Sequence, residues 1–314
     1  MTTAPDRLLR KLEWRVLRRL DGRLQGAYRT AFRGTGIDFD SLREYLPDDD
    51  VRHIDWNVTA RLDQPHVRQY TEDRELTAWL ALDQSASMRF GETPPHPSLG
   101  IDLRRPEDQA PLAASGKDSM LTDLAVCLAR LFSRGGNRVG AILYDNLRHR
   151  VVPPRTGRDH VLRLTDLVTA PTAERGGGST DLAAMLRLAA RNARRRSLLF
   201  VVSDFIGEGD WAGELTRLAL RHEVVAIRVV HPAELDLPDL GLVLVEDAET
   251  GEQMLADTGD PLFRERLRAE VEAREAEVDA AMGRAGVAAH RVRTDDDLVE
   301  VLVAMVRRTR RVRR

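Results

Sequence analysis

The stretch AWLALDQSAS, residues 78–87, decides both the fold and the candidate site. Its first half is continuously apolar, which is typical of a strand that helices cover on both faces. Its second half places Asp83, Ser85 and Ser87 on the loop that leaves this strand, with three hard oxygens on one side of a turn. Oxygen ligands of this kind suit Mg²⁺, which prefers octahedral geometry and keeps several waters.

Further apolar runs alternate with amphipathic stretches after this point. A hairpin, 242–246 with 253–256, interrupts the alternation. Such an alternation predicts an α/β fold, a mostly parallel sheet with helices on both faces. The predicted strands are 139–144, 198–202, 224–230 and 287–292, and the predicted helices are 119–134, 159–168, 181–194, 211–221 and 260–284.

Two later stretches carry oxygen ligands at similar positions. The loop GGGSTD, residues 176–181, presents Thr180 where a helix begins, and Ser203 and Asp204 end the apolar run 198–202. The carboxyl ends of parallel strands lie on one edge of a sheet, and ligands bind there. We therefore expect Asp83, Thr180 and Asp204 to meet at this edge.

The chain divides into two parts near residue 76. Residues 5–28 have the periodicity of an amphipathic helix, and residues 30–76 combine Arg, Asp and aromatic residues with turn signals. We expect residues 1–76 to form this helix and an irregular extension, with one or two short strands, that packs on a domain of residues 77–314.

Composition excludes several classes of protein. Of 314 residues, 42% are hydrophobic and 31% charged, with a net charge of −2, which indicates a folded globular protein without a global attraction to nucleic acid. The single cysteine, Cys127, excludes a disulfide framework, and its position on an apolar helix face predicts a buried thiol. Only Lys11 and Lys117 are lysines among 48 basic residues, which we attribute to genome composition.

No apolar run reaches the roughly 18 residues that a membrane-spanning helix needs, and the first 20 residues do not have the pattern of a secretory signal. We expect a cytoplasmic protein, either free or peripheral to the membrane. Five prolines mark residues 92–116 as a surface insertion, and residues 307–314 form a basic tail.

Two resemblances sharpen this interpretation. Asp83-x-Ser85-x-Ser87 with Thr180 and Asp204 resembles the metal-ion-dependent adhesion site of von Willebrand factor A domains. The preceding segment is similar to domain-of-unknown-function family 58, in which it precedes such an A domain. The similar strings are GTGIDF at 34–39, LREY at 42–45, DDVRHIDW at 49–56, AR at 60–61 and VRQY at 67–70. The chain departs from the family at Asp48, where a glycine is usual, and in the insertion 92–116.

The resemblance implies a Rossmann-like, three-layer A domain and a non-enzymatic binding module. One Mg²⁺ or Mn²⁺ would be held by Asp83, Ser85, Ser87, Thr180 and Asp204, the last two directly or through water. Its open position would accept an Asp or Glu carboxylate of a client or of a MoxR-type AAA+ ATPase, which the protein would serve as an adaptor or co-chaperone.

Two alternatives remain at this point. A magnesium-dependent phosphatase or hydrolase could use Asp83 as nucleophile, but the residue two positions later, where such enzymes place a second Asp, is Ser85. Nucleic acid or an anionic membrane surface could bind the arginine-rich ends. Lys117 follows Gly116 but does not complete a phosphate-binding loop, because Asp118 stands where that motif needs Ser or Thr. In the extension, Trp56 is expected as a core anchor.

Overall fold

The computed structural model describes residues 12, 38–46, 49–51, 54–62, 64–71, 76–91, 116–145, 148–170, 180–207, 209–237, 239–246 and 252–312. The helix expected at 5–28 therefore lies outside the described residues except for Leu12, and so does the insertion except for Gly116. The elements in chain order are β1 (Asp38–Glu44), α4 (Trp56–Leu62), β2 (His66–Thr71), β3 (Thr77–Asp83), η3 (Ser87–Arg89), α5 (Lys117–Arg134), β4 (Arg138–Tyr144), β5 (His149–Arg155), α6 (Arg158–Val168), α7 (Leu182–Asn192), β6 (Leu198–Ser203), α8 (Trp211–Arg221), β7 (Glu223–Val230), α9 (Pro232–Leu235), β8 (Leu242–Glu246), β9 (Gln253–Asp257), α10 (Pro261–Ala285), β10 (Ala288–Arg293) and α11 (Leu298–Val312).

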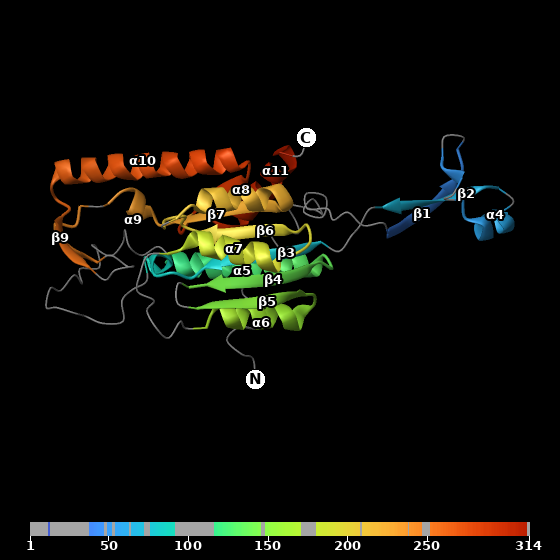
Figure 1. The fold of residues 1–314 in the computed structure, drawn as a ribbon, viewed down its shortest axis with the longest axis horizontal. Coiled ribbons are helices and arrows are strands. Elements are labelled where there is room, and N and C mark those ends of the chain that lie inside the picture. Colours follow the sequence, from blue (N-terminus) through green and yellow to red (C-terminus); the bar gives the residue numbers. More distant parts are fainter. Residues whose placement is uncertain are drawn as a thin grey trace.

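A six-stranded sheet forms the centre of the molecule (Figure 1). Its strand order is β10-β7-β6-β3-β4-β5, and every neighbouring pair is parallel except β4 with β5. The central strands β3 and β6 are buried along nearly their whole length, which explains their continuous apolar sequence. The predicted mixed α/β architecture with a mostly parallel sheet is confirmed.

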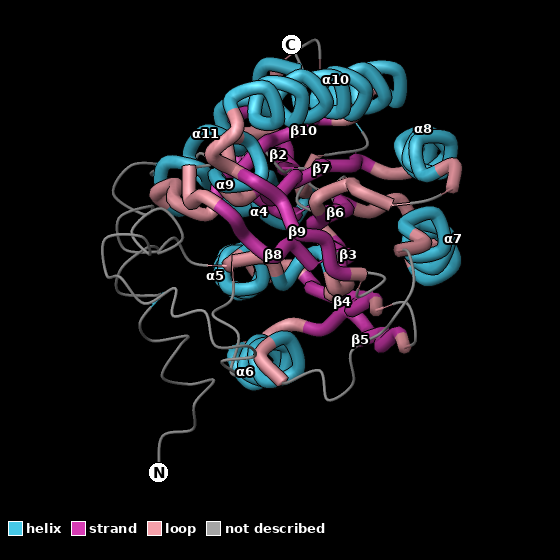
Figure 2. Tube along the Cα trace, turned by 90° about the vertical axis from the view of Figure 1, so that its left-hand side faces the viewer, coloured by secondary structure: helices cyan, strands magenta, loops and turns pink. Residues whose placement is uncertain are grey.

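Helices cover both faces of this sheet, so that the structure has three layers (Figure 2). One buried cluster joins α5, α6 and α11 to side chains such as Leu80 and Phe200 of the sheet. A second cluster joins α7, α8 and α10 to the opposite face, where Ala81 and Val201 lie. Alternate residues of one strand thus point into different clusters, as the two-residue period of a strand requires.

The helix ends follow from local chemistry. Asp181, Asp210 and Asp260 precede α7, α8 and α10, and each carboxylate accepts a hydrogen bond from a backbone amide of the first turn. Gly286 ends α10 with a positive φ of 65°, which glycine adopts without strain. The predicted strands and the five predicted helices of this domain are confirmed to within a few residues.

The segment before β3 forms a small antiparallel ribbon of β1 and β2 with the short helix α4. Here the expectation for Trp56 is wrong, because its side chain is 69% exposed. None of the residues of α4 is buried, so this helix offers no core in which a tryptophan could anchor. Arg43 and Asp49 form a two-pronged ion pair within the segment, with N–O distances of 2.7 and 2.6 Å.

Candidate functional site

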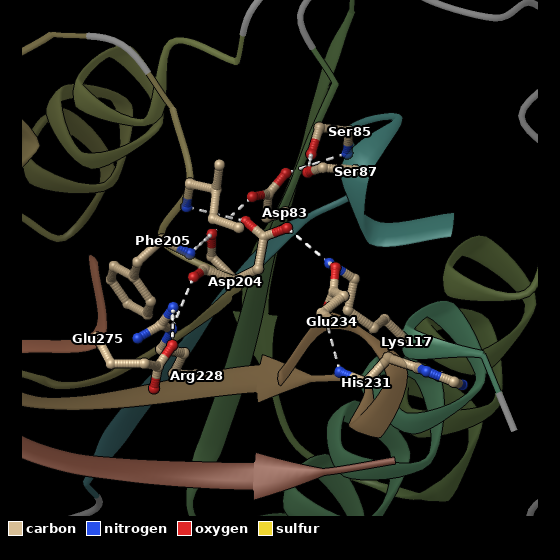
Figure 3. Close-up of polar contacts among 12 residues, drawn as sticks. Asp83, Ser85, Ser87, Lys117, Asp204, Phe205, Arg228, His231, Glu234 and Glu275 are labelled. Carbon is tan, nitrogen blue, oxygen red and sulfur yellow. Dashed lines mark hydrogen bonds and ion pairs between the residues drawn. The ribbon is translucent and has the colours of Figure 1, made fainter. Parts of the chain in front are cut away.

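The candidate site lies where β3 and β6 end side by side. Leu82 pairs with Val202 in the parallel register, so Asp83 and Ser203 leave the sheet next to each other and Asp204 follows directly. All three side chains are buried, and Figure 3 shows the carboxylates of Asp83 and Asp204 next to each other. The sheet edge thus brings together two acidic groups that are 121 positions apart in the sequence.

The Asp83 carboxylate receives its hydrogen bonds from neutral donors. The Ser203 hydroxyl donates to Oδ2 at 2.6 Å, and the Ser85 backbone amide donates to Oδ1 at 3.0 Å. Burial and the nearby charge of Asp204 raise the pKa of Asp83 to about 6. This carboxylate therefore lies in a place where an additional positive charge would be favourable.

The hydroxyls of Ser85 and Ser87 lie beside Asp83 on the loop that leads into η3. Their oxygens are 3.1 Å apart, and Ser85 is buried while Ser87 is partly exposed. Two adjacent ligands of an octahedral Mg²⁺ with bonds near 2.05 Å would be about 2.9 Å apart. The pair therefore has nearly the spacing that such an ion requires.

The Asp204 carboxylate, in contrast, is paired with a cation. Lys117 Nζ donates to Oδ2 at 2.8 Å, and the Ile206 amide donates to Oδ1 at 3.0 Å. Lys117 also binds Glu234 of α9 at 2.7 Å, and its side chain is completely buried. Burial alone would lower the pKa of Lys117, but the charges of Asp204 and Glu234 outweigh it and raise the pKa.

A sharp turn after β6 aims Asp204 at Asp83. Phe205 has a φ of +57°, an uncommon conformation for a bulky residue, and its amide donates to the Ser203 hydroxyl at 2.9 Å. Its ring is buried against Trp211, with centroids 5.4 Å apart. Arg228 of β7 stabilises the turn, because its Nε donates a hydrogen bond to the Asp204 carbonyl at 3.0 Å. The Arg228 guanidinium also forms an ion pair with Glu275 of α10 at 2.6 Å. Backbone strain held in place by such packing is typical of functional sites.

Thr180 reaches the same region by its backbone. A Cβ placed on Gly207 would lie 2.5 Å from the Thr180 carbonyl oxygen, so the two chain segments are in close contact just after Asp204. The Thr180 side chain is buried, and Asp181 caps α7 directly behind it. The structure therefore brings Asp83, Ser85, Ser87 and Asp204 together and places the Thr180 backbone against the loop of Asp204.

Sequence reasoning missed three residues that shape this site: Lys117, Glu234 and Phe205. Lys117 was considered only as part of an incomplete phosphate-binding motif. A signal was nevertheless present, because Lys117 is one of two lysines in a chain that otherwise uses arginine. Lysine carries a compact charge with three donors, which can contact two carboxylates at once, as it does here.

The donor set fits one hard divalent ion of the magnesium type. It consists of carboxylates and hydroxyls, and burial together with the neighbouring charge of Asp204 raises the pKa of Asp83. Across the described residues, no three His, Cys, Asp or Glu side chains gather in a manner that could hold a metal. Serine and threonine hydroxyls would therefore have to supply part of the coordination.

Comparison with known proteins identifies the family. The family model described as "Protein of unknown function DUF58" matches residues 41–96 and 105–277. The chain belongs to this DUF58 family. The match begins within β1 and includes the Asp83 loop, Lys117, Thr180, Asp204 and Glu234, so the whole candidate site lies inside the matched residues.

Individual relatives and solved structures also match the chain. The uncharacterized protein Rv1480 of Mycobacterium tuberculosis (strain ATCC 25618 / H37Rv) is 36% identical over 304 residues, which cover 96% of this chain and 89% of that protein. The crystal structure of conserved hypothetical protein BatB from Bacteroides thetaiotaomicron matches with a TM-score of 0.44 and 14% identity over 76% of this chain and 98% of its own. An aerotolerance-related membrane protein from Bacteroides fragilis NCTC 9343 matches with a TM-score of 0.44 and 16% identity, over 75% and 99% of the two chains. Among the described helices of the present chain, none is both long and apolar enough to cross a membrane.

Proposed function

We propose that this DUF58 protein is a metal-dependent protein-binding module of the von Willebrand factor A type. The observation that carries the proposal is the pair of buried carboxylates, Asp83 and Asp204, beside the hydroxyls of Ser85 and Ser87 at the carboxyl edge of the sheet. One Mg²⁺ or Mn²⁺ would be held there by Asp83, Ser85 and Ser87, with Thr180 and Asp204 binding it directly or through water.

The residues of the site support a binding role. A bound dication would supply a positive centre, short of protein charge, that attracts an anionic oxygen from outside. Asp83 and Asp204 already accept hydrogen bonds from Ser203, Ser85, Ile206 and Lys117 at all four of their oxygens. Because these contacts hold both carboxylates in place, an external Asp or Glu carboxylate is the natural additional ligand.

The proposed partner is a MoxR-type AAA+ ATPase or its client, which this protein would serve as an adaptor or co-chaperone. The support for a binding role over hydrolysis lies in the surroundings of Asp83. The residue two positions later, Ser85, offers a hydroxyl that is hydrogen-bonded to Ser87. A hydrolase of this kind would need an acid at that position to protonate the leaving group.

The experiment is an affinity capture from the native cell with the full chain as bait. Wild type and Asp83→Asn are compared with Mg²⁺ and with EDTA, and bound proteins are identified by mass spectrometry. We expect an AAA+ ATPase with the wild type in Mg²⁺ and its loss in both EDTA and the variant. Recovery that is independent of metal and of Asp83 would contradict the proposal.

A further inference from the structure

Lys117 is a buried cation at the border of the candidate metal site. Its side chain has no exposed surface, and its ammonium lies between Asp204, at the end of β6, and Glu234 of α9 (Figure 3). It is also the first residue of α5, where the helix dipole disfavours a positive charge. The position of Lys117 is therefore explained by its two carboxylate partners and not by the helix it begins.

The surroundings of Lys117 hold it rigidly beside the serine loop. Its backbone amide donates to the Phe90 carbonyl at 3.0 Å, and its ammonium lies 5.9 Å from the centroid of the Phe90 ring. Phe90 also packs edge-on against His231, with centroids 5.2 Å apart. Glu234 is fixed in turn, because its second carboxylate oxygen accepts the His231 amide at 2.9 Å. The charge of Lys117 thus cannot move away easily when the charge of the site changes.

The charges of the cluster do not cancel. Asp83, Asp204 and Glu234 carry three negative charges when ionised, and Lys117 supplies one positive charge. The remainder of −2 equals the charge that one dication would neutralise. Lys117 contacts Asp204 and Glu234 and offsets one of their two negative charges, so one unbalanced charge remains on that pair and the other lies on Asp83, beside Ser85 and Ser87.

We propose that Lys117 is a fixed internal cation that sets the affinity of this site for divalent ions. The inference rests on the proposed metal-binding function. Lys117 holds Asp204 in place before an ion arrives, and its charge then opposes the ion. The site therefore binds a dication more weakly than its carboxylates alone would, and the positive charge of Lys117 close to the bound ion favours the approach of an external carboxylate.

The expected effect of Lys117 on affinity follows from Coulomb's law. A dication and a unit charge about 6 Å apart repel by roughly a tenfold change in affinity even at the dielectric constant of water. In a buried site the effect is larger. Replacing Lys117 by the similarly long but neutral methionine should therefore tighten ion binding at least tenfold.

The test compares wild type, Lys117→Met and Glu234→Gln by titration with Mn²⁺, followed by electron paramagnetic resonance, and by thermal melts with and without Mn²⁺. We expect Lys117→Met to melt lower than wild type without the ion, to bind Mn²⁺ at least tenfold more tightly, and to gain more from it in the melt. Glu234→Gln removes a carboxylate and should bind Mn²⁺ more weakly than wild type.

The other possible results distinguish the proposed role of Lys117 from the proposed metal binding. Equal dissociation constants in wild type and Lys117→Met, with melting temperatures lowered alike with and without Mn²⁺, would give Lys117 a purely structural role and leave metal binding standing. Binding by Lys117→Met alone would support the inference and reject metal binding by the native chain, whereas binding by neither would reject both. If Lys117→Met does not fold, the double variant Lys117→Met/Glu234→Gln is compared with Glu234→Gln, and the same tenfold difference is expected.

Discussion

The two aspartates at the edge of the sheet have the same chemistry but opposite surroundings. Asp204 is paired with a buried ammonium, while Asp83 receives hydrogen bonds from uncharged amide and hydroxyl groups and faces the charge of Asp204. This difference shows that a positive charge is already present at Asp204 and is lacking at Asp83. A cation at Asp204 is part of the fold, and a cation at Asp83 would have to come from solution.

Asp204→Ala should have the largest effect, because it breaks the buried pair with Lys117. Removing one partner of a buried pair costs about 3–5 kcal/mol when the remaining charge is left without compensation. Lys117 keeps Glu234 as a partner, so we expect a loss near the lower end of this range. We expect this loss in urea unfolding with EDTA, and we expect no rescue by Mg²⁺. A loss below 1 kcal/mol would show that Lys117 and Asp204 do not depend on each other.

Asp83→Asn should change stability little without metal and should abolish the stabilisation by Mg²⁺, the opposite of Asp204→Ala. Without metal, the amide of Asn accepts hydrogen bonds from Ser203 and Ser85 less well than the carboxylate does. The substitution also removes a buried negative charge next to Asp204, and because the two effects oppose each other, the free energy of unfolding should change little. With Mg²⁺ at ~100 times its dissociation constant, the wild type should gain about 2.7 kcal/mol, and the variant should gain nothing. Thermal melts with and without Mg²⁺ measure both effects, and an equal gain in the variant would place the ion elsewhere.

Gly207→Ala tests the position of Thr180. The added Cβ would lie 2.5 Å from the Thr180 carbonyl oxygen, a backbone atom that can yield only if the segment moves. We expect a loss of about 1–3 kcal/mol, typical of overpacking, together with a smaller stabilisation by Mg²⁺. Gly283→Ala is the matched control, because a Cβ at that glycine meets nothing within 4 Å. If Gly207→Ala lowers stability but leaves the Mg²⁺ effect unchanged, Thr180 is not a ligand.

The pH dependence of stability should reveal the uncompensated charge of Asp83. The pKa of Asp83 is about 6 in the folded protein and near 3.8 as its ordinary value. A carboxyl whose folded pKa is raised stabilises the fold below its unfolded pKa and loses that contribution as the pH rises through the folded value. In EDTA, wild type should therefore lose stability relative to Asp83→Asn between about pH 4 and pH 6. A difference that does not change with pH would mean that Asp83 titrates normally.

Arg43→Ala should have the smallest effect. Arg43 and Asp49 form a short ion pair, but Arg43 is about one-third exposed and the pair belongs to the β1–β2 segment. Solvent screens such pairs, so the variant should keep the wild-type stabilisation by Mg²⁺. A reduced response to Mg²⁺ would link this segment to the site.

The central strands and the helices could be predicted because the pattern of apolar residues within each segment indicates which side chains are buried. The strands β3, β4, β6 and β7 are apolar runs, and the helices between them have clear periodicity. β5 escaped prediction because it is an antiparallel edge strand that contains Pro153 and Pro154, which have no backbone donors. The prediction for Trp56 was wrong because tryptophan side chains are usually buried, whereas α4 has no buried residues.

The candidate site was predictable only in its acidic and hydroxyl residues. Asp83, Ser85, Ser87 and Asp204 follow strands, and the topology of a parallel sheet brings strand ends together. Lys117 and Glu234 come from helices, and their pairing depends on how α5 and α9 lie against the edge. No local pattern encodes that arrangement.

Counting bound ions is the most direct test of the central claim. Wild type and Asp83→Asn, stripped with EDTA, are dialysed to equilibrium against Mn²⁺, and the metal in the protein compartment is measured by atomic absorption. We predict one ion per wild-type chain and none above background for Asp83→Asn. Absence of bound metal in the wild type at millimolar Mn²⁺, or the same amount in both proteins, would contradict the account.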